Sequence, residues 1–383
     1  MSWDTICVGD VCKYTTSGGT PRSSVISYYE PPTVPWLKTK EVNYCRIYQT
    51  ESCISQEGLD NSSAKLIPEN SVIVAMYGQG DTAGRVAINK IPVSTNQACC
   101  NLIINPEKAD YEFVYYALSA LYEKLVSLKN GGAQPNLSAQ IIRSVEIPFP
   151  PLETQHKIAD ILSAYDDLIE NNQKQIKLLE EAAQRLYKEW FIDLRFPNHE
   201  TTPVVDGVPE GWGKVEIGAC IARVARTKQV MTSDVLNSGM IPVVDQSRNF
   251  VAGYTNDIET VVDLGVPVIV FGDHTRVLKY IQFPFARGAD GTQLIVSNTD
   301  RMPQSLLYCG LLNIDLSNYH YARHFKYLKA EEILLPTRNI ACKFDSIVAT
   351  LFKQVQSLRD KCTLATEARD RLLPKLMNGE IEV

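Results

Sequence analysis

Two apolar stripes with the same spacing run through this 383-residue chain. In each stripe, ten positions follow at alternating intervals of four and three residues, and nine of the ten are apolar. This spacing places them along one face of an α-helix, as in a coiled coil, and predicts two helices about 48 Å long. The positions are Ile158, Leu162, Tyr165, Ile169, Asn172, Ile176, Leu179, Ala183, Leu186 and Trp190, and then Phe344, Val348, Leu351, Val355, Leu358, Cys362, Ala365, Arg369, Leu372 and Leu376.

The second stripe begins 186 residues after the first. The same offset aligns the segments before the stripes, residues 146–150 and 332–336, each predicted as a short strand that a proline ends before the helix. The starts of the domains also match, because Trp3, Ile6, Val8 and Gly9 have the spacing of Trp212, Val215, Ile217 and Gly218. The chain is therefore predicted to be one unit written twice, a domain followed by a long helix.

We predict a first domain over residues 1–150, a helix over 151–195, a second domain over 196–340 and a second helix over 341–383. Short apolar runs at residues 71–76 and 266–271, separated by Gly and Pro, together with a few helices such as residues 111–128, indicate the α+β class for both domains. A long helix with one apolar seam needs a partner in water. We expect the two helices to form an antiparallel coiled coil in a pseudo-two-fold repeat. The alternatives are that each helix packs on its own domain, or joins two chains.

The two polar positions in the seams are Asn172 and Arg369. We interpret them as residues that set the register of the helices or reach to the edge of the seam.

The charge balance does not by itself favour nucleic acid, because 38 basic and 44 acidic residues give a net charge of −6. DNA affinity would have to come from local clusters of basic side chains, or from partners. The ten cysteines form no CxxC pair and the five histidines are dispersed, so we expect no metal site. A run of about 18 apolar residues and a signal-peptide pattern are both missing from the sequence, and we expect a cytoplasmic chain with no membrane partner.

Motifs of catalysis are also missing. The sequence has no GxxxxGK[ST] phosphate loop, no HExxH, no GxSxG and no Asn/Asp-Pro-Pro-Tyr/Phe motif for a flipped base. This favours a binding protein without catalytic residues and without a cofactor of its own. A nuclease leaves a weaker signature, so an undetected nuclease site stays an alternative. A protein-binding scaffold without DNA contact is a third hypothesis, which fits the acidic charge.

Several motifs resemble those of the specificity subunits of type I restriction-modification systems. Residues 150–158 (Pro-Pro-Leu-Glu-Thr-Gln-His-Lys-Ile), followed by Ile161-Leu162 and Trp190-Phe191, are similar to their first conserved region. Residues 371–381 (Arg-Leu-Leu-Pro-Lys-Leu-Met-Asn-Gly-Glu-Ile) are similar to the end of the second. Residues 18–21, 36–39, 76–80, 84–88 and 96–97 resemble one class of their target-recognition domains. The resemblance covers nearly the whole chain.

The resemblance implies that each domain recognises one half of a bipartite site in double-stranded DNA. The helix pair then sets the length of the spacer between the halves. Two modification subunits, which bind S-adenosylmethionine and methylate adenine, are the implied partners. Restriction subunits, which are ATP-dependent translocases and endonucleases, can join them. The two helix entrances differ, since residues 336–340 depart from residues 150–154 and Ala341 aligns with Gln155. The two partner contacts are therefore expected to differ.

Candidate DNA contacts in the first domain are polar side chains on loops, because such groups bond base edges and phosphates. The first choice is the glycine-containing loop at residues 77–82, where close approach to DNA is possible. A plain hairpin is the alternative for this loop, solvated surface is the alternative for Thr20, Arg22 and Lys38, and a plain turn is the alternative for the loop that holds Gln134 and Asn136. The candidates are Thr20, Arg22, Lys38, Tyr77, Gln79, Arg85, Gln134 and Asn136.

The matching loop of the second domain is at residues 271–276, again after an apolar run, and residues 245–248 are the second choice. The candidates in this domain are Gln246, Ser247, Arg248, His274, Thr275, Arg276 and Arg287.

Insertion of one heptad into both predicted helices should lengthen the spacer of the recognised site and leave the half-sites unchanged. Sequencing of the methylated sites measures both quantities. Altered half-site bases with an unchanged spacer would contradict the role assigned to the helices.

Overall fold

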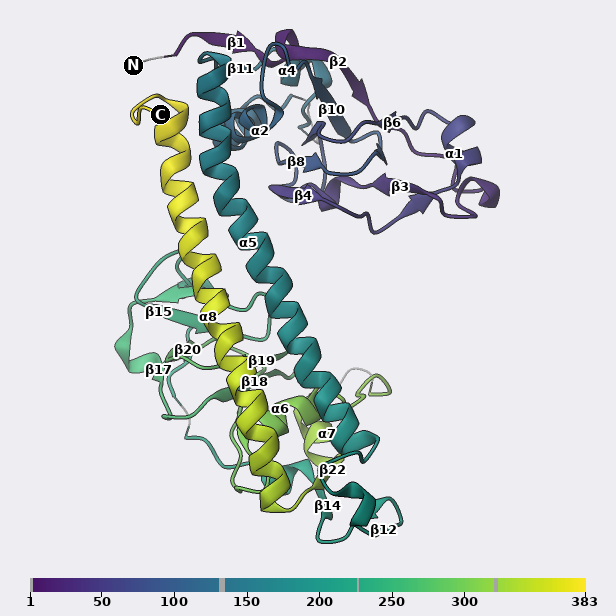
Figure 1. The fold of residues 1–383 in the computed structure, drawn as a ribbon. Helices are drawn as coiled ribbons and strands as arrows, with labels where there is room; N and C mark the ends of the chain where they lie inside the picture. Colours follow the sequence, from purple (N-terminus) through teal and green to yellow (C-terminus); the bar gives the residue numbers. More distant parts are fainter. Residues whose placement is uncertain (1–2, 131–134, 226, 320–322) are drawn as a thin grey trace. The chain divides into compact units, whose positions relative to one another are not determined.

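The structure is a computed structural model that describes residues 3–130, 135–225, 227–319 and 323–383 (Figure 1). The chain forms two compact units. Unit 1 comprises Met1–Glu170 and Thr363–Val383, and unit 2 comprises Asn171–Cys362. Each unit therefore contains one domain together with a part of each long helix. The mixed α/β class predicted from the sequence is confirmed.

The two long helices are α5 (Leu152–Tyr187), which continues into a π-helical turn at Lys188–Ile192, and α8 (Arg338–Met377). In unit 1, Ile158 of α5 shares a hydrophobic core with Leu376 of α8. In unit 2, Ala183 of α5 shares a core with Phe344 and Val348 of α8. The start of one helix thus packs with the end of the other, which is the expected antiparallel pairing.

The seam positions chosen from the sequence face inward in each unit. Nine of the eighteen apolar positions are buried and nine are half-buried. The buried nine are Ile158, Leu162, Ala183, Trp190, Phe344, Val348, Val355, Ala365 and Leu376, and the half-buried nine are Tyr165, Ile169, Ile176, Leu179, Leu186, Leu351, Leu358, Cys362 and Leu372.

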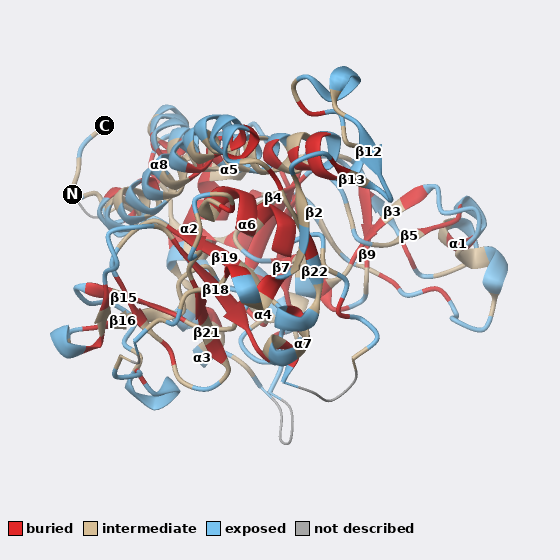
Figure 2. Cartoon of the chain, turned by 90° about the horizontal axis from the view of Figure 1, so that it is seen from below, coloured by how far each residue is buried: buried red, intermediate tan, exposed pale blue. Residues whose placement is uncertain are grey.

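The domain of unit 1 contains a five-stranded sheet in the order β2-β10-β7-β8-β4 and a four-stranded sheet in the order β5-β3-β9-β6. Strand β7 is a fully buried run of Val and Ile residues, which favour sheets (Figure 2). Helix α2 contacts β7 and β8. The strands are β1 (Thr5–Cys7), β2 (Cys12–Ser17), β3 (Val34–Leu37), β4 (Cys45–Ile47), β5 (Cys53–Ile54), β6 (Leu66–Ile67), β7 (Val72–Ala75), β8 (Val86–Asn89), β9 (Val93–Thr95), β10 (Cys99–Ile104) and β11 (Glu146–Pro148).

The short helices of unit 1 are α1 (Gln56–Asp60), α2 (Tyr111–Ala120), α3 (Tyr122–Ser127) and α4 (Ala139–Arg143). The side chains of Ser55, Asp110 and Ser138 accept hydrogen bonds from backbone amides and cap three of these helices. The single helix expected over residues 111–128 is thus two helices, with the break at Leu121.

The domain of unit 2 contains a three-stranded sheet in the order β19-β18-β21 and a four-stranded sheet in the order β16-β15-β20-β17. Its central strand β18 is completely buried, like β7. The elements are β12 (Val204–Val205), β13 (Val208–Pro209), β14 (Gly213–Glu216), β15 (Ile241–Val244), β16 (Gly253–Thr255), β17 (Val261–Val262), β18 (Val268–Gly272), β19 (Leu278–Ile281), β20 (Phe285–Arg287), β21 (Thr292–Ile295), β22 (Glu332–Leu335), α6 (Gln304–Leu311) and α7 (His324–Ala330).

The repeat seen in the sequence has a structural counterpart in each unit. In unit 1, β1 pairs antiparallel with β11 and Ile6 lies opposite Ile147. In unit 2, β14 pairs antiparallel with β22 and Val215 lies opposite Ile333. Each pair joins the first strand of a domain to the strand that leads into a long helix. Both domains are therefore closed at the start of their helix by the same two-stranded frame.

The residues Gln155 and Ala341, which distinguish the two helix entrances, are both buried inside their units. Gln155 is completely buried, donates from Nε2 to the Pro150 carbonyl (2.9 Å) and accepts from the Asp110 amide (3.1 Å). Ala341, at the matching position of α8, is completely buried in the core of unit 2. Gln155 thus fastens α5 to its own domain, and a partner contact through this side chain stays a prediction.

All ten cysteines lie within the described residues, and none of them forms a disulfide. Within the described ranges, none of the helices is long and apolar enough to cross a membrane.

Replacement of Phe344 by Ala should destabilise unit 2 by about 3–5 kcal/mol, because Phe344 is completely buried and its ring contacts Tyr187, Trp190 and Phe191. Urea denaturation followed by tryptophan fluorescence measures the loss. The matched control is Leu364→Ala on the same helix, where the side chain is 65% exposed and the expected change is within about 0.5 kcal/mol. Equal effects of the two substitutions would contradict the assigned seam.

Candidate nucleic-acid interface

In unit 1, several loops meet at the carboxyl end of β7. The Met76 amide donates to the Ala98 carbonyl (2.8 Å), and the Leu137 amide donates to the Met76 carbonyl (2.9 Å). The Gly19 amide donates to the Thr95 carbonyl (2.8 Å). These bonds join the glycine-containing turn near residue 19, the loop between β9 and β10, the loop after β7 and the loop before α4. Polar side chains that are far apart in the sequence are thereby brought to one edge of the domain.

Most candidates predicted for the first domain lie on these loops or next to them. The Thr20 hydroxyl donates to Oε1 of Gln97. The Lys38 ammonium lies 5.1 Å from the centre of the Trp36 ring. Gln79 is exposed at the tip of the loop after β7. The half-buried Tyr77 and the exposed Asn136 flank the bond between Met76 and Leu137.

The sequence predicted no contact at Gln97. This residue lies in the turn between β9 and β10, two residues before the buried strand β10.

Arg85 has a different environment from the one expected for a DNA contact. Its guanidinium donates to Oδ1 of Asp81 (2.6 Å) and to Oδ1 of Asn43 (2.8 Å). These bonds hold the loop after β7 in shape, and a direct DNA contact by Arg85 stays a prediction. Arg22 is exposed. Gln134 lies outside the described residues.

In unit 2, the candidates at the end of β18 form one hydrogen-bonded cluster. The Thr275 hydroxyl donates to the Gln246 carbonyl (2.6 Å), and the His274 amide donates to Oε1 of Gln246 (3.1 Å). Gln246 donates from Nε2 to the Asp290 carbonyl (2.9 Å). Gly291 has φ +72°, and a Cβ atom there would lie 2.7 Å from the His274 ring. A side chain at residue 291 would therefore displace this cluster.

A buried lysine supports the neighbouring loop at residues 245–249. Lys279 is 4% exposed and donates from Nζ to the backbone carbonyls of Asp245 (2.8 Å) and Asn249. Burial lowers the pKa of Lys279, and the nearby Asp245 carboxylate opposes this effect. Ser247 is bonded to the same carboxylate (2.6 Å), and Arg248 is exposed at the tip of the loop.

Arg276 lies at the end of the cluster and has φ +62°. Its guanidinium donates to the Leu316 carbonyl (3.0 Å), so part of its donor capacity is used within the domain.

A second group in unit 2 lines a pocket of about 350 Å³. The pocket brings the predicted Arg287 next to Arg223, Gln293 and Lys329, and none of the described residues that line it is acidic. Arg223 and Lys329 were not chosen from the sequence, because residues 223 and 329 are more than 100 positions apart. In a chain with a net charge of −6, such a basic concavity is the kind of local cluster that DNA binding needs.

No group of three or more His, Cys, Asp and Glu side chains among the described residues is placed to hold a metal ion. The polar groups described at the two domain edges offer hydrogen bonds from amides and hydroxyls, with added positive charge in unit 2.

Comparisons with known proteins agree with one another. Residues 1–181 match the family model of the type I restriction modification DNA specificity domain. Over its whole length the chain is 28% identical to the specificity subunit of the type I restriction enzyme MjaIX of Methanocaldococcus jannaschii, and it covers 94% of that protein. It is also 28% identical to the EcoR124I/EcoR124II specificity subunit of Escherichia coli, over 52% of this chain and 50% of the relative.

The fold is similar to the crystal structure of the type I restriction-modification S subunit from M. genitalium, with a TM-score of 0.61. That likeness covers 98% of this chain and 96% of the other, at 16% identity. Residues 1–181 carry the type I restriction modification DNA specificity domain, and over its whole length the chain is similar to type I specificity subunits, which are DNA-recognition components and not catalysts.

Proposed function

We propose that this chain recognises a bipartite target in double-stranded DNA, one half-site with each domain, for modification subunits that methylate adenine. The observation that carries the proposal is a repeated frame with unlike recognition loops. The β1–β11 and β14–β22 pairs are equivalent, whereas the loops after β7 and β18 carry different side chains. Two equal frames can hold the domains in the same way, while unlike loops recognise different bases.

The side chains at the two edges suit recognition of bases and phosphates. Gln79 and Gln97 in unit 1 can bond adenine edges, as amide side chains do in the major groove. In unit 2, Gln246 offers a side-chain amide and Thr275 a hydroxyl for hydrogen bonds to bases. Arg223, Arg287 and Lys329 add the positive charge that phosphate contacts require.

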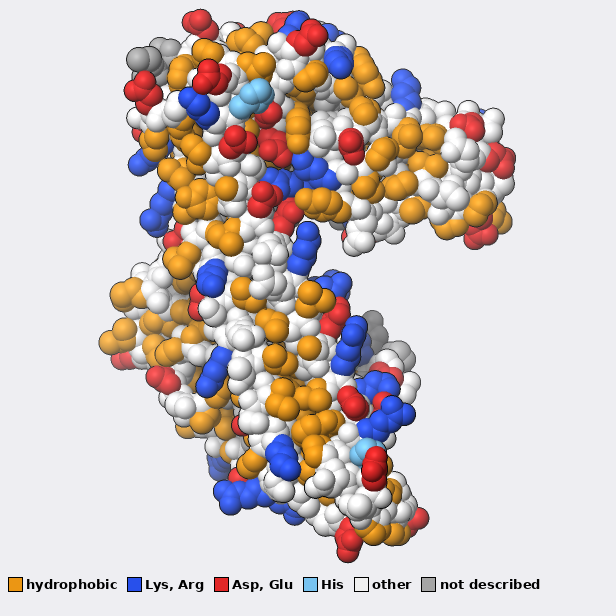
Figure 3. Space-filling view, viewed as in Figure 1, with side chains coloured by type: hydrophobic (Ala, Val, Ile, Leu, Met, Phe, Trp, Pro, Cys, Tyr) orange, Lys and Arg blue, Asp and Glu red, His pale blue; other side chains and the backbone are white. Residues whose placement is uncertain are grey.

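The helices support the proposal of two identical partners. Ile161 of α5 and Ile347 of α8 are 36% and 45% exposed, and they are 186 residues apart. Leu178 of α5 and Leu364 of α8 are 64% and 65% exposed, again 186 residues apart. Exposed apolar side chains along the helix pair of unit 2 are visible in Figure 3. Because exposed apolar groups on helices mark contact surfaces, one unit is expected to bind one modification subunit, and the other unit a second copy.

The modification subunits would bring S-adenosylmethionine, since we assign no cofactor to this chain. Restriction subunits would join the same assembly to cut DNA.

Deletion of this chain from its host, with the partner genes intact, should abolish methylation at one bipartite adenine motif. Methylome sequencing with and without the chain measures this. An unchanged methylome from an actively expressed locus would contradict the proposal. A gel shift with the modification subunits present separates DNA recognition from a scaffold that binds only protein.

Gln79→Ala should weaken recognition of one half-site, because loss of a bidentate base contact costs about 1–3 kcal/mol of discrimination. Competition binding by the assembled complex measures the effect on DNA with either half-site altered. The control is Glu107→Gln, an exposed residue of the same domain beyond the opposite end of β10. Equal affinity of the Gln79→Ala and Glu107→Gln complexes for the intact site would remove Gln79 from the interface.

A further inference from the structure

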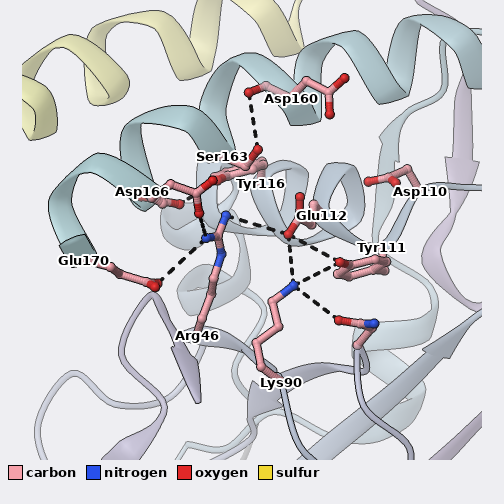
Figure 4. Close-up of polar contacts among 12 residues, drawn as sticks. Arg46, Lys90, Asp110, Tyr111, Glu112, Tyr116, Asp160, Ser163, Asp166 and Glu170 are labelled. Atoms are coloured by element: carbon pink, nitrogen blue, oxygen red, sulfur yellow. Dashed lines mark hydrogen bonds and ion pairs between the residues drawn. The ribbon is translucent and has the colours of Figure 1, made fainter. Parts of the chain in front are cut away.

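A cluster of charged side chains, most of them shielded from solvent, joins the domain of unit 1 to helix α5 (Figure 4). Arg46, at the centre of β4, has a side chain that is only 6% exposed. Its guanidinium forms an ion pair with Asp167 of α5 and lies 3.9 Å from Glu170 of the same helix. It also lies 3.7 Å from Glu112 of α2. We call the group of charged side chains formed by Arg46, Glu112, Asp166, Asp167 and Glu170 the ionic seat.

The ionic seat extends across the domain through Glu112. The Lys90 ammonium lies 3.1 Å from Glu112 and donates to the Tyr111 hydroxyl (2.9 Å). The Tyr48 hydroxyl, on the chain after β4, donates to Oε2 of Glu170 (3.0 Å). Strand β4 and the residue after its end are thereby tied to α5, and Lys90, directly after β8, is tied to α2.

Asp166 extends the ionic seat to the second long helix. The Tyr116 hydroxyl of α2 donates to Oδ2 of Asp166 (2.5 Å), and the Arg369 guanidinium of α8 donates to Oδ1 (2.5 Å). Asp166 is 8% exposed. The polar interruption predicted at Arg369 is thus the partner of a buried carboxylate, which fixes the domain, α5 and α8 at a single point.

The charges in the ionic seat depend on one another. Burial opposes the charge of Arg46, but the carboxylates around it, Asp167 foremost, hold its pKa above the ordinary value. Burial and the charge of Asp166 raise the pKa of Tyr116, so Tyr116 stays a hydrogen-bond donor. Removal of one partner leaves another charge buried without compensation, which is costlier than the loss of an exposed ion pair.

The repeat shows that the ionic seat is not required by the fold. The position equivalent to Asp166 in unit 2 is Phe352, and the position equivalent to Arg369 is Ala183. The Phe352 ring packs on Tyr280 (4.7 Å between centres) and Tyr308 (5.5 Å).

The counterparts of Asp167 and Glu170 are Lys353 and Gln356, which line an open pocket of about 530 Å³. An ion pair of unit 2, Arg359 with Glu180, has its guanidinium on the Phe250 ring. At the position where Asp166 forms an ion pair in unit 1, Phe352 therefore packs on aromatic rings of the domain in unit 2.

We propose that Arg46 and Asp166 are positioning residues that fix the angle of the first domain on the helix pair and so determine which spacer length is accepted. The inference rests on the proposed bipartite recognition. A step of one base pair is about 3.4 Å along the duplex, so a domain that tilts by a few ångströms at its DNA edge can reach a half-site one step away. Ion pairs with fixed geometry prevent such tilting, because each guanidinium must keep its alignment with its carboxylates. The recognition loops at the end of β7 are untouched, so the bases recognised stay the same.

The experiment uses the full chain with its modification subunits and a plasmid library of target sites. The library carries the native spacer and spacers one base pair shorter and longer. Arg46→Met removes the charge and keeps the length of the side chain, and Asp166→Asn keeps its shape. We expect the ratio of methylation at off-length sites to native sites to rise about tenfold in both variants, with unchanged half-site bases. Arg46→Lys, which keeps the charge, should restore part of the discrimination.

The control is Glu51→Gln, which removes an exposed ion pair with Lys40 in the same domain and should leave the spacer profile unchanged. If Arg46→Met does not fold, Asp167→Asn carries the test, because that side chain is 68% exposed and its loss leaves the core intact. Unchanged spacer profiles in the folded variants, or altered half-site bases, would overturn the inference. Failure of the unsubstituted chain to direct methylation to any bipartite site would instead overturn the proposed function.

Discussion

The structure depends on burial of the two apolar helix seams, because a long helix with one apolar face needs a packing partner in water. In unit 1, the seam is continuous with the core of the domain, since Ile158 and Leu162 of α5 lie in one cluster with Phe113 and Leu376. In unit 2, Ala183, Phe344 and Val348 lie in one cluster with Ile269 and Leu306. The helices are therefore part of each domain's core as well as a link between domains. Movement of a helix in its seam would disturb the packing that supports the recognition loops.

The two copies of the repeat share their strand pairs and differ in their loops and in the contacts beneath the loops. The β1–β11 and β14–β22 frames occur in both units, where each joins the first strand of a domain to the strand that leads into a long helix. The loops after β7 and β18 lie outside these strand pairs and carry different side chains. Differences also occur beneath the loops, where Asp166 and Arg369 meet in one unit and Phe352 and Ala183 replace them in the other. The two copies therefore also differ in the contacts that hold each domain on the long helices.

The long helices and the repeat could be predicted because their signals are local and periodic. The strand ends at residues 71–76 and 266–271 were close for the same reason, since buried runs of β-branched residues have few alternatives. The ionic seat could not be predicted, because Arg46 and Asp167 are 121 residues apart and only the fold brings them together. The hydrogen bonds of Arg85 to Asp81 and Asn43 were equally hidden, although Asp81 is four positions away, since the sequence does not show which way this arginine points.

The acidic balance of the chain is compatible with DNA recognition when basic groups gather locally, as Arg223, Arg287 and Lys329 do in unit 2. If the two domains contact two separated stretches of one duplex, hydroxyl-radical footprinting of the target DNA with this chain and its modification subunits should show two protected stretches, one for each half-site. The bases between them should be unprotected, and substitutions in the spacer should leave the footprint unchanged. One continuous protected stretch, with an affinity that depends on the central bases, would contradict contact by two separate domains.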